Sequence, residues 1–414
     1  MAFVNLEAAL ATGSAGWPTK DEVIHAAPLE VLDWLRSIGF DSLSLANNHT
    51  GDLGPGALLD ALGAVSERGF LHAGAGVDRA RAALPGSRPD RPVPLWLVAV
   101  STGQPPVAGA ALDPKVDLPG RPGVNALRVR RELGADPSTF EALRHFVEST
   151  GHGARIRRDV TAGRRKPLPD DSLDLFGTPV RQADTVSERY VADPEDRERL
   201  LAACRAASAA GAHCVVSIHN HAWPPDWSEV PDWLSDLAHR CVDSGAVGVF
   251  AHGAPATGPI EIYRDRPILY GLGNLVFHTA RPDGYPGPDV WRGFVFDGQF
   301  SSSGQLTTAR ILPITIDREG PDRGFPCPAS EATGEAILER VAQQSQPWGT
   351  SVVVSGQDAG TISWTRQSRT SGQMPRPPAQ GTAGRLPGRL VVDGQHGRRS
   401  GQRQETERCD RCRE

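Results

Sequence analysis

The sequence has few lysines, no long apolar run and no excess of positive charge. Lysine occurs only at Lys20, Lys115 and Lys166, so the basic residues are almost all arginine, a bias that we attribute to GC-rich coding. The net charge of −5 gives no general reason to expect a nucleic-acid partner. No stretch reaches the roughly 18 apolar residues that a membrane helix needs, and the first residues lack the pattern of a signal peptide. We therefore expect the chain as given to be cytoplasmic.

Cysteine is also sparse, with six residues scattered along the chain. Cys204, Cys214 and Cys241 lie in apolar patterns that predict ordinary core positions. Cys409 and Cys412 have CxxC spacing, but a structural zinc site needs a second pair of ligands. The cysteine pattern therefore excludes a secreted disulfide scaffold and gives only weak support for a zinc site.

The composition is that of a globular protein, with 39% hydrophobic and 22% charged residues in 414. Helical and strand periodicities alternate from about residue 28 to 101 and again from 194 to 354, which predicts an α/β fold. Residues 102–190 are rich in Pro, Gly, Arg and Asp, with one amphipathic helix around Thr139–Glu148, and are interpreted as a long insertion that is ordered only in part. Residues 366–414 are an Arg/Gly-rich tail with no apolar period, predicted to be disordered. The predicted domain is thus residues 1–365, followed by this tail.

Three strand-like segments end in histidine, namely residues 43–49, 215–221 and 247–252. Because the carboxyl ends of strands in an open α/β sheet share one edge, the three ends are expected to converge. His219 and His221 would point to the same side of an extended chain, since side chains alternate with period two. A single histidine is more often structural, but three at equivalent positions indicate a site.

The residues around these strand ends predict a metal centre. Glu7 offers a carboxylate, Asn48 an amide oxygen, and His219, His221 and His252 offer imidazoles, a mixed set that suits Zn, Mn or Fe in a hydrolytic centre. His49 is a candidate general acid, which Asp52 would orient. The alternatives are an Asx-turn for Asn48, a solvated carboxylate for Glu7 and a helix cap for Asp52.

Trp223, Trp227 and Trp233 follow the second histidine-ended strand directly. They can form the wall of a substrate cleft, although packing of the loop is the more common role of such residues. Gly271–Asn274 is glycine-rich but is not followed by a helix, so it is not interpreted as a nucleotide cradle. Asn274 is assigned a weak supporting role beside the site.

The same segments, in this order, resemble the CapA-type capsule-synthesis proteins associated with poly-γ-glutamate production. The resemblance covers roughly residues 3–365 and is carried by "VNLEAAL", "SLANNHTGDLGPGALLDAL", "VVSIHNHAW" and "VFAHGAPATGPIEIYRDRPILYGLGNLVFHT". It implies a calcineurin-like metallophosphoesterase fold, in which two sheets form a β-sandwich flanked by helices in four layers. It also implies that Glu7, Asn48, His219 and His252 are metal ligands and that His49 is the adjacent acid.

Two positions depart from the family pattern. The family opens with a strand ending in Gly-Asp, which this sequence lacks, so the chain is interpreted as N-terminally truncated. Pro255 stands where the last motif usually has a second histidine, and His221 is assigned as a partial replacement. Besides an α/β domain whose buried histidines are purely structural, two hypotheses follow for function. The first is a hydrolase that uses a divalent ion (Mn, Fe, Zn or Mg) on a phosphoester or anionic polymer, in contact with capsule-synthesis machinery. The second is a non-catalytic member that binds such a polymer.

Overall fold

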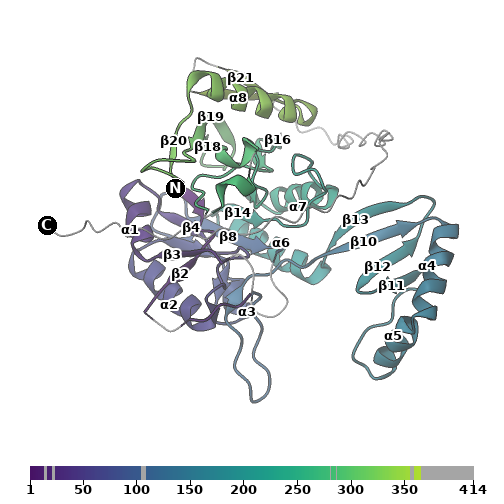
Figure 1. The fold of residues 1–414 in the computed structure, drawn as a ribbon. Coiled ribbons are helices and arrows are strands. Elements are labelled where there is room, and N and C mark those ends of the chain that lie inside the picture. The colour runs from purple at the N-terminus through teal and green to yellow at the C-terminus, as the bar shows by residue number, and fades with distance from the viewer. Residues whose placement is uncertain are drawn as a thin grey trace, which may run out of the picture. The chain divides into compact units, whose positions relative to one another are not determined.

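The computed structural model describes residues 1–13, 16–20, 24–103, 109–279, 281–285, 287–354 and 359–364. The predicted tail, with Cys409 and Cys412, lies outside these residues. The predicted mixed α/β class is confirmed, because helices and strands alternate along the chain and the strands form several sheets (Figure 1). In the described part of the chain, no helix combines the length and the apolar character needed to cross a bilayer.

The N-terminal part forms a small parallel sheet covered by helices. Its strands are β1 (Phe3–Asn5), β4 (Ser42–Ser44) and β5 (Leu71–Ala73), in the order β1-β4-β5. Helices α1 (Glu30–Ser37) and α2 (Gly54–Glu67) pack on one face, where Leu32, Leu35 and Val65 meet Leu43 and Leu45. Burial of these apolar side chains, worth about 1.5–3 kcal/mol each, holds the helices on the sheet.

A six-stranded sheet forms the centre of the molecule. Its order is β16-β17-β15-β14-β8-β7, with β17, β15, β14 and β8 mutually parallel. The strands are β7 (Gly86–Arg88), β8 (Leu95–Ser101), β14 (His213–His219), β15 (Ala246–His252), β16 (Ile260–Tyr263) and β17 (Arg266–Leu269). Helices α6 (Pro194–Ala209) and α7 (Asp232–Asp243) cover one face with Leu200, Cys204, Leu237 and Cys241, so the core role predicted for these two cysteines and for Cys214 is confirmed.

The opposite face of the six-stranded sheet packs against the small sheet. Ala46, Leu71 and Ala73 from the small sheet contact Leu97 and Val215 from the larger one in a single apolar cluster. This packing places the carboxyl ends of β4, β14 and β15 close together. The prediction that these three ends converge is correct, but they come from two sheets and not from one sheet edge.

A third sheet follows, made of antiparallel strands, of which β18 and β19 are the longest. Its members are β18 (Arg292–Phe300), β19 (Leu306–Ile316), β20 (Pro326–Pro328), β21 (Thr350–Val354) and β22 (Gly360–Trp364). Helix α8 (Glu331–Ser345) packs on it through Leu338 and Val341, which share a core with Ile260 and Leu269 of the central sheet.

The predicted insertion contains more regular structure than the sequence suggested. Residues 129–192 form the four-stranded sheet β11-β12-β10-β13, from β10 (Val129–Ala135), β11 (Ser172–Leu175), β12 (Thr178–Gln182) and β13 (Ser187–Ala192). The predicted helix is present as α4 (Pro137–Ser149), and α5 (His152–Thr161) follows it. From residue 129 to residue 192 the stretch is more regular than the expectation of partial order, because runs of charged residues, such as Arg130, Arg131 and Glu132 in β10, hide the alternation typical of a strand.

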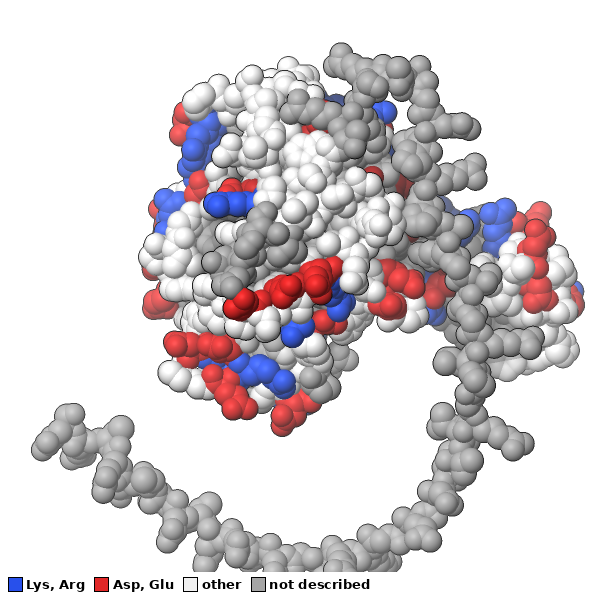
Figure 2. All heavy atoms as spheres, turned by 90° about the horizontal axis from the view of Figure 1, so that it is seen from above, with Lys and Arg blue, Asp and Glu red and all other residues white. Residues whose placement is uncertain are grey.

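The remaining elements are short. They are β2 (Ala9–Ala11), β3 (Ala26–Pro28), β6 (Ala75–Gly76), β9 (Gly123–Val124), α3 (Arg79–Ala82) and the 3₁₀ turns η1 (Pro282–Gly284), η2 (Asp289–Trp291) and η3 (Gln346–Trp348). On the face drawn in Figure 2, acidic and basic side chains are interspersed, and neither sign covers a broad area.

Candidate metal centre

His219 lies at the centre of a cluster of polar side chains between the two packed sheets. It is the last residue of β14, and it is paired in register with His252, the last residue of β15. Its Nε2 atom lies 2.8 Å from Oδ1 of Asn48, which follows β4. Its Nδ1 atom lies 3.0 Å from Nδ1 of His252. The two ring nitrogens of His219 thus face potential ligands from the ends of two other strands.

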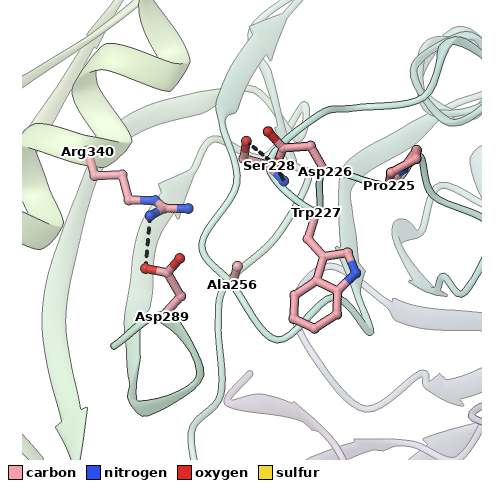
Figure 3. Close-up of a pocket in the computed structure, with 7 residues that line it drawn as sticks. All are labelled: Pro225, Asp226, Trp227, Ser228, Ala256, Asp289 and Arg340. Atoms are coloured by element: carbon pink, nitrogen blue, oxygen red, sulfur yellow. Dashed lines mark hydrogen bonds and ion pairs between the residues drawn. The ribbon is translucent and has the colours of Figure 1, made fainter. Parts of the chain in front are cut away.

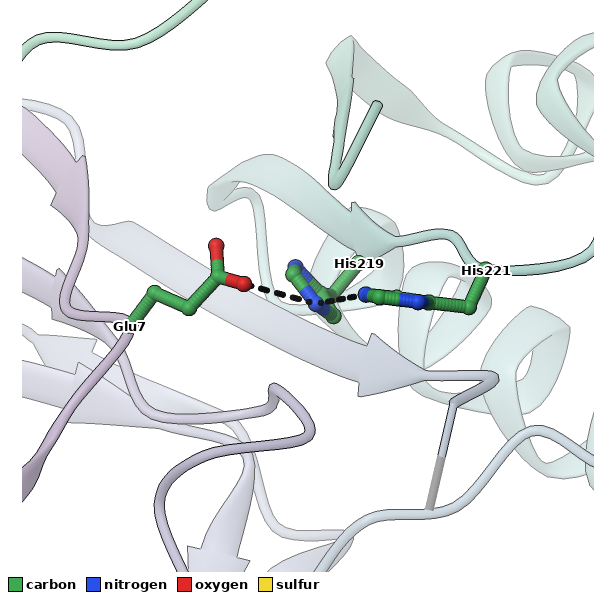
Figure 4. A group of neighbouring side chains, drawn as sticks. All are labelled: Glu7, His219 and His221. Atoms are coloured by element: carbon green, nitrogen blue, oxygen red, sulfur yellow. Dashed lines mark hydrogen bonds and ion pairs between the residues drawn. The ribbon is translucent and has the colours of Figure 1, made fainter. Parts of the chain in front are cut away.

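Glu7 and His221 complete the side of the cluster that faces His219 Nε2. A Glu7 oxygen lies 3.5 Å from this atom, and His221 Nε2 lies 3.0 Å from it (Figure 4). Ligand atoms of Glu7, His219 and His221 all lie within 4.8 Å of one another, a spacing that fits a shared ion. As predicted from the two-residue alternation, His219 and His221 face the same side of the chain.

Alternation along the strands also explains what lies beneath the cluster. Ser217 points to the same side as His219 and lies 2.8 Å, through Oγ, from His252 Nε2. Ser101, the register partner of His219, and Ser44 have buried hydroxyl groups without a hydrogen-bond partner in the described part of the chain. Serine side chains therefore take the place of apolar side chains where the interface between the two sheets reaches the His219 cluster.

Burial favours the protonation states that metal ligands require of histidine. It lowers the pKa of His219 far below its usual value, that of His221 to about 4 and that of His252 to about 3, so the rings are neutral at pH 7. Glu7 keeps 34% of its side-chain surface exposed, yet burial of its carboxyl group raises its pKa to about 8. Burial outweighs the Lys20 ammonium, which lowers the pKa of Glu7, and a bound divalent ion would favour the carboxylate form further. The donor set therefore fits a divalent metal.

His252 occupies a different side of His219 from the other three candidates. When His219 uses Nε2 toward Glu7, Asn48 and His221, His252 contacts the opposite nitrogen and is held in turn by Ser217. This geometry allows His252 to orient the His219 ring. A ligand role for His252 would require a site on the Nδ1 side of His219.

His49 and Asp52 form a buried pair beside the cluster. His49 Nδ1 lies 2.7 Å from Asp52 Oδ2, and both side chains are almost inaccessible to solvent. Asp52 also accepts a hydrogen bond from the backbone N–H of His25 at 2.9 Å. Helix α2 begins after Leu53 and has no side-chain cap, so the alternative that Asp52 caps this helix is wrong.

Three further residues hold this pair and were missed by the sequence analysis. Lys20 Nζ lies 2.8 Å from Asp52 Oδ1 and 3.1 Å from His49 Nδ1. The His25 ring stacks on His49 with centroids 3.9 Å apart. Asn47, not Asn48, makes the turn, because its Oδ1 accepts hydrogen bonds from the backbone N–H groups of the two residues after Asn48. Lys20 could have been noticed, since it is one of only three lysines.

Glycine at two positions lets the loops approach the cluster. A Cβ atom on Gly103 would lie 2.7 Å from Cγ of His221. Gly253 has a φ of +117°, and a Cβ atom there would lie 2.3 Å from the backbone oxygen of Asn220. Both positions therefore require glycine for the strand ends to meet.

The comparison with known families gives a match to the bacterial capsule synthesis proteins (PGA_cap) over residues 1–279, which include the whole cluster. The chain belongs to this family. It is 28% identical, over 80% of its length, to the uncharacterised proteins y4sH and y4uA of Sinorhizobium fredii, of which it covers 78%. It is 26% identical over 54% of its length to a protein of Mycobacterium tuberculosis named as a probable polyglutamine synthesis accessory protein, and it covers 56% of that relative. The resemblance to CapA-type proteins is thereby confirmed.

The "IEIY" stretch of this family member contains a buried polar brace. Glu261 accepts a hydrogen bond from the Tyr270 hydroxyl at 2.7 Å, and its other oxygen lies 2.8 Å from His239 Nε2. These contacts join β16 to β17 and to helix α7.

Asn274, which was assigned a supporting role beside the cluster, donates to the backbone oxygen of Val290 at 3.0 Å.

Proposed function

We propose that this member of the capsule-synthesis family is a metal-dependent, phosphoesterase-like hydrolase. The observation that carries the proposal is the convergence of Glu7, Asn48 and His221 on the Nε2 side of His219. With His219, these residues come from three separate segments of the sequence, and each offers an atom type that a hydrolytic metal centre uses.

Glu7, Asn48, His219 and His221 would hold the ion, which we expect to be Mn, Fe, Zn or Mg. A divalent ion in such a centre lowers the pKa of a bound water and polarises a substrate oxygen. The protein's own contribution is to keep the imidazoles neutral by burial and to fix their directions through the strand ends.

His49 would protonate the leaving group. Asp52 and Lys20 both contact Nδ1 of His49, so Nε2 is the nitrogen available to the substrate. Asp52 accepts from Nδ1 and orients the ring, which is the arrangement that a general acid needs. Stacking on His25 restricts the ring further.

The test compares two phosphodiester substrates in the presence of Mn²⁺. Bis(p-nitrophenyl) phosphate has a good leaving group that needs little protonation. The second substrate, a phosphodiester with phenol as its leaving group, needs protonation more. His49→Ala should lower kcat about 10²–10⁴-fold on the phenyl ester and much less on the nitrophenyl ester. His145→Ala, at an exposed histidine on α4, is the matched control. Equal losses on both esters would show that His49 is not the acid.

We also propose a specific layering of the α/β fold. The packing of the small sheet on the central one, with α1 and α2 on one outer side and α6 and α7 on the other, supports a four-layer metallophosphoesterase-like sandwich. We propose residues 1–365 as one domain, with residues 102–190 as its insertion. The substrate is proposed to be a phosphoester or an anionic polymer handled together with the capsule-synthesis machinery.

One observation favours a second function. Pro255 stands where the family pattern has another histidine, so one ligand of a two-metal centre is replaced by a residue that cannot coordinate. A chain that binds one ion but hydrolyses neither ester would instead be a non-catalytic, polymer-binding member of the family.

A further inference from the structure

A pocket of about 510 Å³ is formed by segments that lead away from the metal centre. The loop that carries Trp227 follows His221, and Ala256 follows His252. Arg340 on α8 and Asp289 on η2 form the opposite wall (Figure 3). The volume lies in the range of small-molecule sites, and it holds one or two rings of a chain molecule.

Aromatic rings connect the metal centre to this pocket. The His221 and Trp223 rings have centroids 4.7 Å apart, and the Trp223 and Trp227 rings lie 6.4 Å apart. Trp233 is different, since it is buried and donates through Nε1 to the backbone oxygen of Ala222. The packing role weighed in the sequence analysis therefore applies to Trp233, whereas Trp227 is 45% exposed and offers a flat apolar surface.

The polar groups of the pocket do not favour an anion. Asp226 and Asp289 contribute two carboxylates, and Arg340 contributes one guanidinium group, which lies 2.8 Å from Asp289. Asp226 accepts hydrogen bonds from the N–H and hydroxyl groups of Ser228, which keep its pKa below the usual value. A negatively charged ligand would meet a local charge of the same sign.

We propose that this pocket binds a neutral sugar ring of a saccharide chain. A pyranose has an apolar C–H face that can stack on Trp227 and an edge of hydroxyls that both donate and accept hydrogen bonds. Asp226 and Asp289 would accept from these hydroxyls, and the partly exposed Arg340 would donate to them. The inference goes beyond the proposed function, because it assigns a separate subsite for a neutral sugar ring beside a centre whose proposed substrate is a phosphoester or an anionic polymer.

The test measures binding to metal-free protein, so that it does not depend on hydrolysis. Maltohexaose, cellohexaose, chitohexaose and a hexamer of γ-linked glutamate are titrated by calorimetry after treatment with EDTA. At least one neutral hexasaccharide should bind, and Trp227→Ala should weaken it about tenfold, which is the loss of about 1.4 kcal/mol of stacking. Phe146→Ala, at a comparably exposed aromatic residue on α4, should leave binding unchanged.

Three results would overturn the assignment. The first is that no neutral hexasaccharide binds at about 10 mM, a concentration that detects a binding free energy of about 3 kcal/mol. The second is that a hexasaccharide binds but Trp227→Ala does not weaken its binding. The third is that only the glutamate hexamer binds in a way that depends on Trp227. Asp289→Asn is a second variant, which keeps the indole of Trp227, and it should also weaken the binding of the saccharide. Saccharide binding without ester hydrolysis would contradict the proposed enzyme but support this binding site. Ester hydrolysis without saccharide binding would support the proposed enzyme but contradict this binding site.

Discussion

Asp196 provides a quantitative test of how the structure is held together beside the four-stranded sheet. This carboxylate on α6 is 1% exposed and accepts hydrogen bonds from Arg79 at 3.0 Å, Arg128 at 2.7 Å and Arg199 at 2.8 Å. Arg128 immediately precedes β10, and Arg79 begins α3. Asp196→Asn would keep the shape of the side chain but remove the charge that these arginines share.

The magnitude follows from the pKa of Asp196. Burial raises this pKa, but the hydrogen bonds from Arg128 and Arg199 outweigh burial and lower it from 3.8 to about 2. A shift of this size corresponds to about 2 kcal/mol of stability at pH 7. Because the folded-state pKa is depressed, this contribution is fully present above about pH 4 and is lost as the pH falls toward 2.

Urea unfolding of the wild type and Asp196→Asn at pH 7, 5, 4 and 3 measures this directly. The variant should be less stable by about 2 kcal/mol at pH 7 and 5, and the difference should shrink at pH 4 and 3. Asp33→Asn, which removes a solvent-exposed partner of Arg68, is the control and should have little effect at any pH. A difference that stays constant with pH, or that is no larger than the control, would refute the reasoning.

Two further predictions concern the metal centre and the brace behind it. Gly103→Ala should push the His221 ring aside and weaken Zn²⁺ or Mn²⁺ binding at least about tenfold in calorimetry, because a Cβ atom would lie 2.7 Å from that ring; unchanged affinity would remove His221 from the proposed ligand set. Tyr270→Phe should lower the free energy of unfolding by about 1–3 kcal/mol in urea titrations, because the buried carboxylate of Glu261 loses a donor at 2.7 Å, and a stability equal to the wild type would show that the brace contributes nothing.

The amphipathic helices and the strand ends could be predicted from the sequence because their signals are local. Helix α2 (Gly54–Glu67) carries a local signal of this kind, since its apolar residues recur at helical spacing and Pro55 lies in its first turn. The alternation of side chains placed His219 and His221 together without knowledge of the fold. The residues grouped as candidate ligands also lie together, because each ends a strand or lies within four residues after the end of one.

Features that depend on distant contacts escaped prediction. In β10 and β13, Glu132 faces Arg189 across the strand pair, so the charges are satisfied by each other and the segment reads like a loop. Lys20 reaches a turn about 30 residues away, and no spacing rule connects them. The separation of β4 from β14 into two sheets depends on which apolar faces pack, which a strand's own sequence does not specify.

Titration of Zn²⁺ and Mn²⁺ into metal-free protein tests the central claim most directly. The wild type and His145→Ala should bind about one ion per chain, and His219→Ala, Glu7→Gln and Asn48→Ala should each weaken binding at least about tenfold while the chain stays folded by circular dichroism. Binding that survives in His219→Ala with unchanged affinity, or a wild type that binds no ion, would contradict a metal centre at this cluster.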